Sequence, residues 1–152
     1  MSVENDTFEF LEEAVAAVAL DNALQGIEVH ETVYQTIKTD RGVRVGNGES
    51  QLAPLPGGGA IEEFDCLLSL VCYSRVIGAD KTDRVMARDQ AMDIAKAVSM
   101  LFLTDPSMGG RVRDSRVLKA RRGFDSIGSQ PFAVCELQMV VNETGQQGEY
   151  RG

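Results

Sequence analysis

The stretch from Asp83 to Leu103 constrains the fold of this chain more than any other part of the sequence. A helix of that length would be about 31 Å long, at roughly 1.5 Å per residue. A long helix that is apolar on one face needs a sheet to cover that face. Apolar residues recur at the three- and four-residue spacing of one helix face, at Ala91, Ile94, Ala95, Val98, Leu101 and Phe102.

Local signals mark both ends of this helix. Asp105-Pro106 ends it, because a residue that precedes proline is disfavoured in the helical conformation. Gly109-Gly110 then predicts a sharp turn into a strand. Side chains that can cap the first turn stand at Asp80, Thr82 and Asp83. The methionines of this region are expected to pack in the helix or its turn, at Met86, Met92, Met100 and Met108.

A shorter helix and a strand are predicted ahead of the long helix. Asp6 and Glu9 have the spacing of a capping box, which predicts a helix that begins near Thr7 and ends by Gly26. Its apolar face would comprise Phe8, Leu11, Val15, Val18 and Ala19. Alternation of apolar and polar residues then predicts a strand, with apolar positions at Ile27, Val29, Val33 and Ile37.

The segment Thr39–Gly59 is rich in glycine, asparagine and proline. Its centre is a turn signal, and flanking apolar residues predict two hairpin arms, one at Val43 and Val45 and the other at Gln51–Leu55. A structureless connection of this length is unusual in a compact domain unless it has a function. We therefore predict a protruding, mobile hairpin, with a loop without a role as the alternative. The candidate residues of the protruding loop are Arg41, Arg44, Gly46, Asn47 and Gly48.

Three further strands are predicted, at Ile61–Ile77, Val112–Phe124 and Phe132–Val141. The resulting order, α-β-(β-hairpin)-β-α-β-β, predicts an α+β fold whose antiparallel or mixed sheet carries two main helices on one face. We expect one domain over residues 6–142, with flexible termini at 1–5 and 143–152. A single core between sheet and long helix is predicted to contain Phe64, Leu68, Leu70, Ile94, Val98, Leu101, Leu137 and Met139.

The net charge of −8 is distributed unevenly. Residues 1–37 hold eight acids and no lysine or arginine, whereas residues 111–122 hold six cations against Asp114 alone. In an extended strand the odd positions from Arg111 to Arg121 would share one cationic face. We predict that this face meets the acidic helix of a neighbouring subunit, the alternatives being pairing within one chain or a solvated face. The candidate interface residues are Glu9, Glu12, Glu13, Asp21, Arg111, Arg113, Lys119 and Arg121.

The sequence contains no recognisable catalytic, cofactor-binding or metal site. The single histidine, His30, has no nearby Cys or His to complete a zinc site, and we expect it on the exposed face of its strand. Cys66 and Cys72 lie too far apart along one strand to bond, and Cys135 could lie beside either of them. We expect all three to be reduced and buried. Phosphate-binding loops and nucleophile elbows are absent, so we expect no enzyme and no cofactor.

No apolar run is long enough to span a bilayer, and no signal segment opens the chain, so we expect it to remain in the cytosol or join an assembly built there. An acidic chain is also a poor nonspecific binder of nucleic acid.

The order of elements and one local pattern resemble the tail terminator proteins of long-tailed bacteriophages. The pattern is a long helix that ends in Leu101-Phe102-Leu103, a turn from Asp105 to Val112 that contains Pro106 and Gly109-Gly110, a strand, a short loop and a closing strand at Pro131–Val141. The likeness covers roughly Asp6–Asn142. Related neck, connector and tail-completion proteins share parts of this architecture.

The resemblance implies a structural role in the virion, with assembly in the host cytoplasm. Members of this family form a hexameric ring that caps the tail tube, stops its polymerisation and presents a surface to the head. The implied partners are other copies of the chain, the tail tube protein and a head-completion or connector protein. No cofactor, catalytic residue or membrane is implied, and DNA is expected only as a passenger through the lumen.

Two alternatives from other classes remain open. One is a DNA-binding adapter that uses the arginine-rich strand, against which the negative net charge counts. The other is a small-ligand-binding domain in which the mixed face of Ile61–Ile77 lines a pocket.

Overall fold

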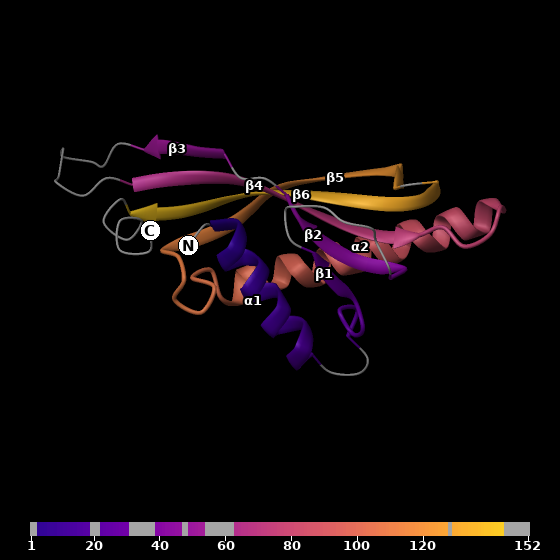
Figure 1. Ribbon diagram of the computed structural model, residues 1–152, viewed down its shortest axis with the longest axis horizontal. Coiled ribbons are helices and arrows are strands. Elements are labelled where there is room, and N and C mark those ends of the chain that lie inside the picture. The colour runs from indigo at the N-terminus through magenta and orange to yellow at the C-terminus, as the bar shows by residue number, and fades with distance from the viewer. Residues whose placement is uncertain are drawn as a thin grey trace.

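The computed structural model describes residues 3–18, 22–30, 39–46, 49–53, 63–127 and 129–144. Both helices lie on the same face of the sheet (Figure 1). The predicted α+β class with a mixed sheet is therefore confirmed. The described elements are α1 (Val3–Ala17), β1 (Glu28–His30), β2 (Arg41–Val45), β3 (Glu49–Ala53), β4 (Glu63–Arg75), α2 (Lys81–Thr104), β5 (Asp114–Ile127) and β6 (Gln130–Thr144).

The sheet is built around β4 and β6, and β4 pairs with β6 along the whole length of β4. The strand order is β1-β2-β4-β6-β5, with β3 also paired to β4. β1 and β2 are parallel, and every other described pair is antiparallel. The long, straight pairing of β4 with β6 gives the sheet a continuous apolar face, on which α2 packs.

The core lies between this face and α2. Alternate residues of β4 and β6 are buried, among them Leu68 and Leu70 on β4 and Leu137 and Met139 on β6. Ile94, Val98 and Phe102 of α2 fill the space beneath them. The predicted core is confirmed for the six of its eight members that are buried, and Leu101 packs against it while partly exposed. The side chain of Phe64 lies outside the described residues.

Both ends of α2 follow the sequence signals. Asp80 caps the first turn, and the Asp83 carboxylate accepts a hydrogen bond from the Asp80 amide at 3.0 Å. After Thr104 the chain turns through three consecutive left-handed residues, Met108, Gly109 and Gly110, at φ of 52°, 70° and 86°. Met108 is fully buried, so the turn is anchored to the core.

The first helix differs from its prediction at both ends. α1 begins at Val3 and ends at Ala17, so Asp6 lies buried within the helix and is not its cap. Val3 is buried in the core cluster, which explains the earlier start. Residues 3–5 and 143–144, expected in flexible termini, belong to α1 and β6. Gly26, at φ of 74°, follows a separate turn in which the Gln25 amide donates to the Asn22 carbonyl.

The predicted hairpin between Val43 and Leu55 is wrong in its pairing. β2 and β3 both pair with β4, β2 with residues 70–74 and β3 with residues 63–67, so they follow each other along one edge. Val43 and Val45 are fully buried, and this burial favours the sheet over a protruding arm. The antiparallel hairpin is β3–β4, and its connection lies outside the described residues.

Candidate functional site

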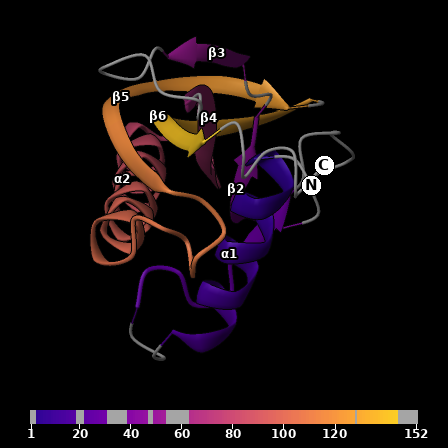
Figure 2. The same cartoon turned by 90° about the vertical axis from the view of Figure 1, so that its left-hand side faces the viewer.

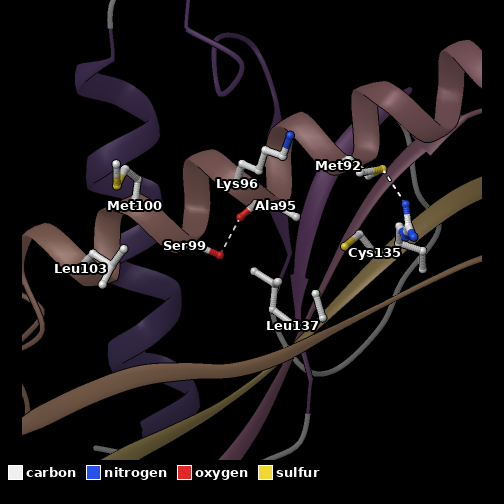
Figure 3. A pocket seen from close by; sticks show the side chains of 10 residues that line it. Met92, Ala95, Lys96, Ser99, Met100, Leu103, Cys135 and Leu137 are labelled. Atoms are coloured by element: carbon white, nitrogen blue, oxygen red, sulfur yellow. Dashed lines mark hydrogen bonds between the residues drawn. The ribbon is translucent and has the colours of Figure 1, made fainter.

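An open groove runs between α2 and β5 on the helix-covered side of the sheet (Figure 3). Its volume is about 340 Å³. α2 forms one wall, β5 the other, and β6 the floor. The lining is mostly apolar and carries two cations; it comprises Met92, Ala95, Lys96, Ser99, Met100, Leu103, Ala120, Arg122, Cys135 and Leu137.

A second hollow of about 240 Å³ continues this groove. The two share Ser99 and Leu103, and the second extends to Pro106 and to Ser115 and Val117 of β5. The stretch of α2 and its turn from Met92 to Pro106 spans about 21 Å at roughly 1.5 Å per residue. We refer to the two hollows together as the α2–β5 groove.

The α2–β5 groove exists because α2 carries a second apolar stripe beside the one that enters the core. Met92, Met100 and Leu103 are the apolar members of this second stripe, at helical spacing, and the polar Lys96 and Ser99 lie among them. Met100 is 59% exposed and Leu103 is 75% exposed, so the stripe is only half covered by β5. The expectation that the methionines pack is confirmed for Met108 and wrong for Met100 and Met86, which are exposed.

The polar groups of the groove are suited to binding carboxylates. Arg122 donates a weak contact to the Met92 sulfur at 3.5 Å and is otherwise exposed. Lys96 is exposed, and Figure 3 shows its ammonium directed away from Leu137 on the floor. The Ser99 hydroxyl donates to the Ala95 carbonyl at 2.9 Å, which leaves its oxygen able to accept one more hydrogen bond. Two cations beside apolar surface fit an acidic, partly apolar partner.

The thiols near the floor are unreactive. Cys72 and Cys135 lie opposite each other on β4 and β6, and Cys66, Cys72 and Cys135 are all free and buried, as expected. Burial raises the pKa of Cys135, with the Arg122 charge opposing this shift. Burial, and then the neighbouring Cys135, raise the pKa of Cys72. Both side chains therefore remain protonated thiols near neutral pH, and neither is an activated nucleophile.

The outer wall of the groove is an edge strand with a bulge. β5 pairs with β6 alone among the described strands, and Leu118 is inserted between Val117 and Lys119. Ser115 and Val117 stand opposite the buried Val141 and Met139, and so face α2. After the bulge, Lys119 stands opposite Gln138 and points to the other face of the sheet. The side chain of Leu118 is 53% exposed.

The predicted cationic face from Arg111 to Arg121 is therefore wrong. Arg111 and Arg113 precede the strand, and the bulge places Lys119 and Arg121 on the opposite face from Ser115 and Val117. A single inserted residue reverses the alternation of faces. Arg121 instead stands across from Glu136 on the face that carries no helix.

Arg111 meets the acidic helix within its own chain. Its guanidinium donates to Glu13 Oε1 at 2.7 Å and to the Met108 carbonyl at 2.9 Å, and lies 3.8 Å from Glu9 Oε2. For Arg111, Glu9 and Glu13, the alternative of pairing within one chain therefore holds. Glu12 is exposed and has no such contact with Arg111. Asp21 lies outside the described residues.

The candidate loop residues lie in the sheet. Arg41 and Arg44 belong to β2, where the Arg41 guanidinium donates to the Gln25 carbonyl at 3.1 Å and Arg44 stands opposite Val71. The Gly46 amide donates to the Ser69 carbonyl at 2.6 Å. These three residues therefore do not form a protruding loop, and Asn47 and Gly48 lie outside the described residues.

His30 is not the exposed residue that the sequence predicted. Its side chain is 11% exposed, and Nε2 lies 2.6 Å from the buried Tyr73 hydroxyl and 3.2 Å from Glu28 Oε1. The hydroxyl passes over Gly42, where a Cβ would collide with it. Burial lowers the pKa of His30, while Glu28 partly opposes and Arg44 adds to the shift. Tyr73 is fully buried, whereas the His30 and Glu28 side chains beside it are 11% and 33% exposed.

The comparisons with known proteins add no family. No family model matches the chain, and no curated protein matches it. Within the described part of the chain, His, Cys, Asp and Glu nowhere gather in the groups of three that could hold a metal ion. The described helices include none with the length and apolar character needed to cross a bilayer.

Proposed function

We propose that this protein is a structural subunit of a bacteriophage tail, a tail-terminator-like protein whose copies associate into a ring. The observation that carries the proposal is the α2–β5 groove, an uncovered apolar surface next to an edge strand. The element order and the turn from Asp105 to Val112, which carry the resemblance to that family, support the same assignment.

The groove has the properties of a protein-binding surface. Met100 and Leu103 are large apolar side chains that α2 exposes at the groove. Monomeric proteins seldom leave such surface uncovered, and an edge strand beside it offers free backbone donors and acceptors. The groove margin carries cations, and residues 1–37 carry an excess of acids. Two copies of this protein therefore offer each other complementary charge.

The role that follows is to close the tail. The ring would cap the tail tube, end its polymerisation and present a face to the head, with the tube protein and a head-completion protein as partners. A neck, connector or tail-completion protein of the same architecture is the nearest alternative. The groove lies on the helix-covered face of the sheet, away from the mixed face of β4 on which a ligand-binding domain was considered. The bulge places Arg116, Lys119 and Arg121 on the helix-free face of β5, opposite Val140, Gln138 and Glu136. The net charge of −8 counts against the use of this face on DNA.

Electron microscopy of the purified protein, together with groove variants, tests this proposal. Wild-type protein at high concentration is expected to show closed rings with a central opening. Leu103→Ser combined with Met100→Ser should abolish the rings, because both side chains are exposed in the subunit and would be buried only on assembly. Met86→Ser is the matched control, since Met86 is 57% exposed on the same helix and does not line the groove.

Circular dichroism should show the same helix content in all these variants. Rings that persist in the double variant would show that the groove is not the assembly surface. Wild-type protein that forms no rings, at any concentration and in the presence of tail tubes, would contradict the proposed function.

A further inference from the structure

Two different surfaces lie on opposite flanks of α2. Figure 2 shows β5 curving over α2, with α1 beside α2. Phe10 of α1 packs against Phe102 of α2, with ring centroids 5.6 Å apart. Phe102 also borders the second hollow of the α2–β5 groove, but no described residue of α1 lines either hollow. The α1 helix of a subunit therefore cannot enter the groove of that same subunit.

The outward face of α1 is acidic and carries small side chains. Glu12, Glu13, Ala16 and Ala17 are all exposed, while Phe10 and Leu11 on the other side are buried. α1 has 15 residues and is thus about 22 Å long, close to the length of about 21 Å along the groove. Alanines allow another helix to approach closely, and residues 1–37 contain no cation that would repel the groove margin.

The groove margin has the complementary character. Lys96 and Arg122 are exposed on its two walls, one on α2 and one on β5, and neither forms an ion pair among the described residues. Met100 and Leu103 offer apolar surface between and beyond these charges. An occupant with acids at its edges and small apolar residues at its centre matches this arrangement.

We infer, resting on the proposed function, that the α2–β5 groove of one subunit receives the outward face of α1 from the next subunit. Ala16 and Ala17 then pack against Met100 and Leu103, and Glu12 lies near the cations of the groove margin. The two surfaces differ and lie on opposite flanks, so the contact is head-to-tail and repeats from subunit to subunit, closing into a ring. The cationic partner of α1 is thus the groove margin, and not the outward face of β5.

A charge-reversal exchange tests this contact. One variant carries Lys96→Glu and Arg122→Glu in the groove, and a second carries Glu12→Lys in the helix. Each alone should lose about tenfold or more in assembly affinity at low salt, because like charges then face each other across every contact. An equimolar mixture should assemble, since alternating subunits restore opposite charges at both kinds of contact. The readout is the mass of the species in solution by light scattering.

The matched control is Lys81→Glu with Arg84→Glu, which changes the net charge equally at exposed positions of α2 outside the groove. It should assemble as wild type does. All substituted positions are exposed, and thermal melting of each variant checks that the subunit is folded.

The outcomes separate this inference from the proposed function. Wild-type assembly with unaffected reversal variants overturns the groove contact and leaves the ring proposal standing. Loss of assembly in both variants without recovery in the mixture overturns α1 as the occupant. Wild-type protein that never assembles contradicts the ring proposal, and with it this inference.

Discussion

At the scale of single residues, Gly42 and Tyr73 depend on each other. Gly42 stands opposite Tyr73 on β4, and a Cβ at this position would collide with the Tyr73 ring and with the Glu28 carbonyl of β1. The absent side chain thus allows Tyr73 to be buried against Phe132, edge to face at 5.5 Å, and to reach His30. The sequence could not reveal this, because the pairing joins residues 31 positions apart.

Gly42→Ala should therefore destabilise the protein by about 1–3 kcal/mol, as overpacking of a filled site does. The matched control is Gly123→Ala, because a Cβ there meets no atom within 4 Å. Its stability should be unchanged or slightly raised. Urea denaturation of both variants measures the difference, and equal midpoints for the two would refute the packing argument.

His30 should make stability depend on pH. Burial lowers its pKa from the ordinary value of 6.5, so the unfolded chain binds the proton more readily than the folded protein. The stability that neutral His30 contributes is then fully present above about pH 6.5, and it is lost as the pH falls from there through the lowered pKa. Glu28, Arg44 and Tyr73 face the imidazole and set the size of the shift.

The check is urea unfolding at pH 7.5 and pH 5.5 for wild type and His30→Gln. Wild type should lose more stability between these two pH values than the variant, because carboxylates elsewhere contribute equally to both. The same loss in the two proteins would show that His30 does not carry this dependence.

At the scale of elements, helical periodicity was the reliable signal. α2 was predicted because its apolar spacing, its cap at Asp80 and its stop at Asp105-Pro106 are all local. The pairing of β2 and β3 with β4 was missed because it is not local: each of the two strands pairs with residues of β4 that lie ten or more positions further along the chain. The groove was missed because Met92 and Leu103 lie outside the apolar stripe of α2 that enters the core. Their positions beside that stripe can be read from the helical spacing of the sequence.

The bulge in β5 gives a prediction at this scale. Deletion of Leu118 should be tolerated, because the pairs on both sides, Val117 with Met139 and Lys119 with Gln138, then follow in regular register. Deletion of Gly123 should destabilise the protein more, because β5 is regular there and a lost residue shifts the register. The residues on one side of the deletion then point to the opposite face of the sheet. Thermal unfolding of the two deletion variants compares them, and a larger loss for the Leu118 deletion would contradict the bulge assignment.

At the scale of the whole molecule, the charge asymmetry was correctly read from the sequence, but its geometry was not. Arg111 neutralises part of the acidic helix within one chain, through Glu9 and Glu13. Glu12 of α1, and Lys96 and Arg122 at the margin of the α2–β5 groove, are among the charged residues that stay exposed. Exposed pairs contribute only about 0–1 kcal/mol each, so in the proposed contact they would set the register, while the apolar groove would supply most of the affinity.

Salt should therefore affect the rate of assembly more than its extent. Raising the ionic strength to 1 M shortens the screening length to about 3 Å and weakens steering between exposed charges. Stopped-flow light scattering should show slower association at high salt, with the final mass nearly unchanged. A final mass that falls to that of the monomer would mean that charge, and not apolar burial, holds the subunits together.

The mass of the wild-type protein in solution, measured over a range of concentrations, tests the central claim most directly. Sedimentation velocity should show a species of about 99 kDa, six times the 16.5 kDa chain, whose share grows with concentration. A species of 16.5 kDa alone at every concentration, and in the presence of tail tubes, would contradict the assignment of this protein as a ring-forming tail subunit.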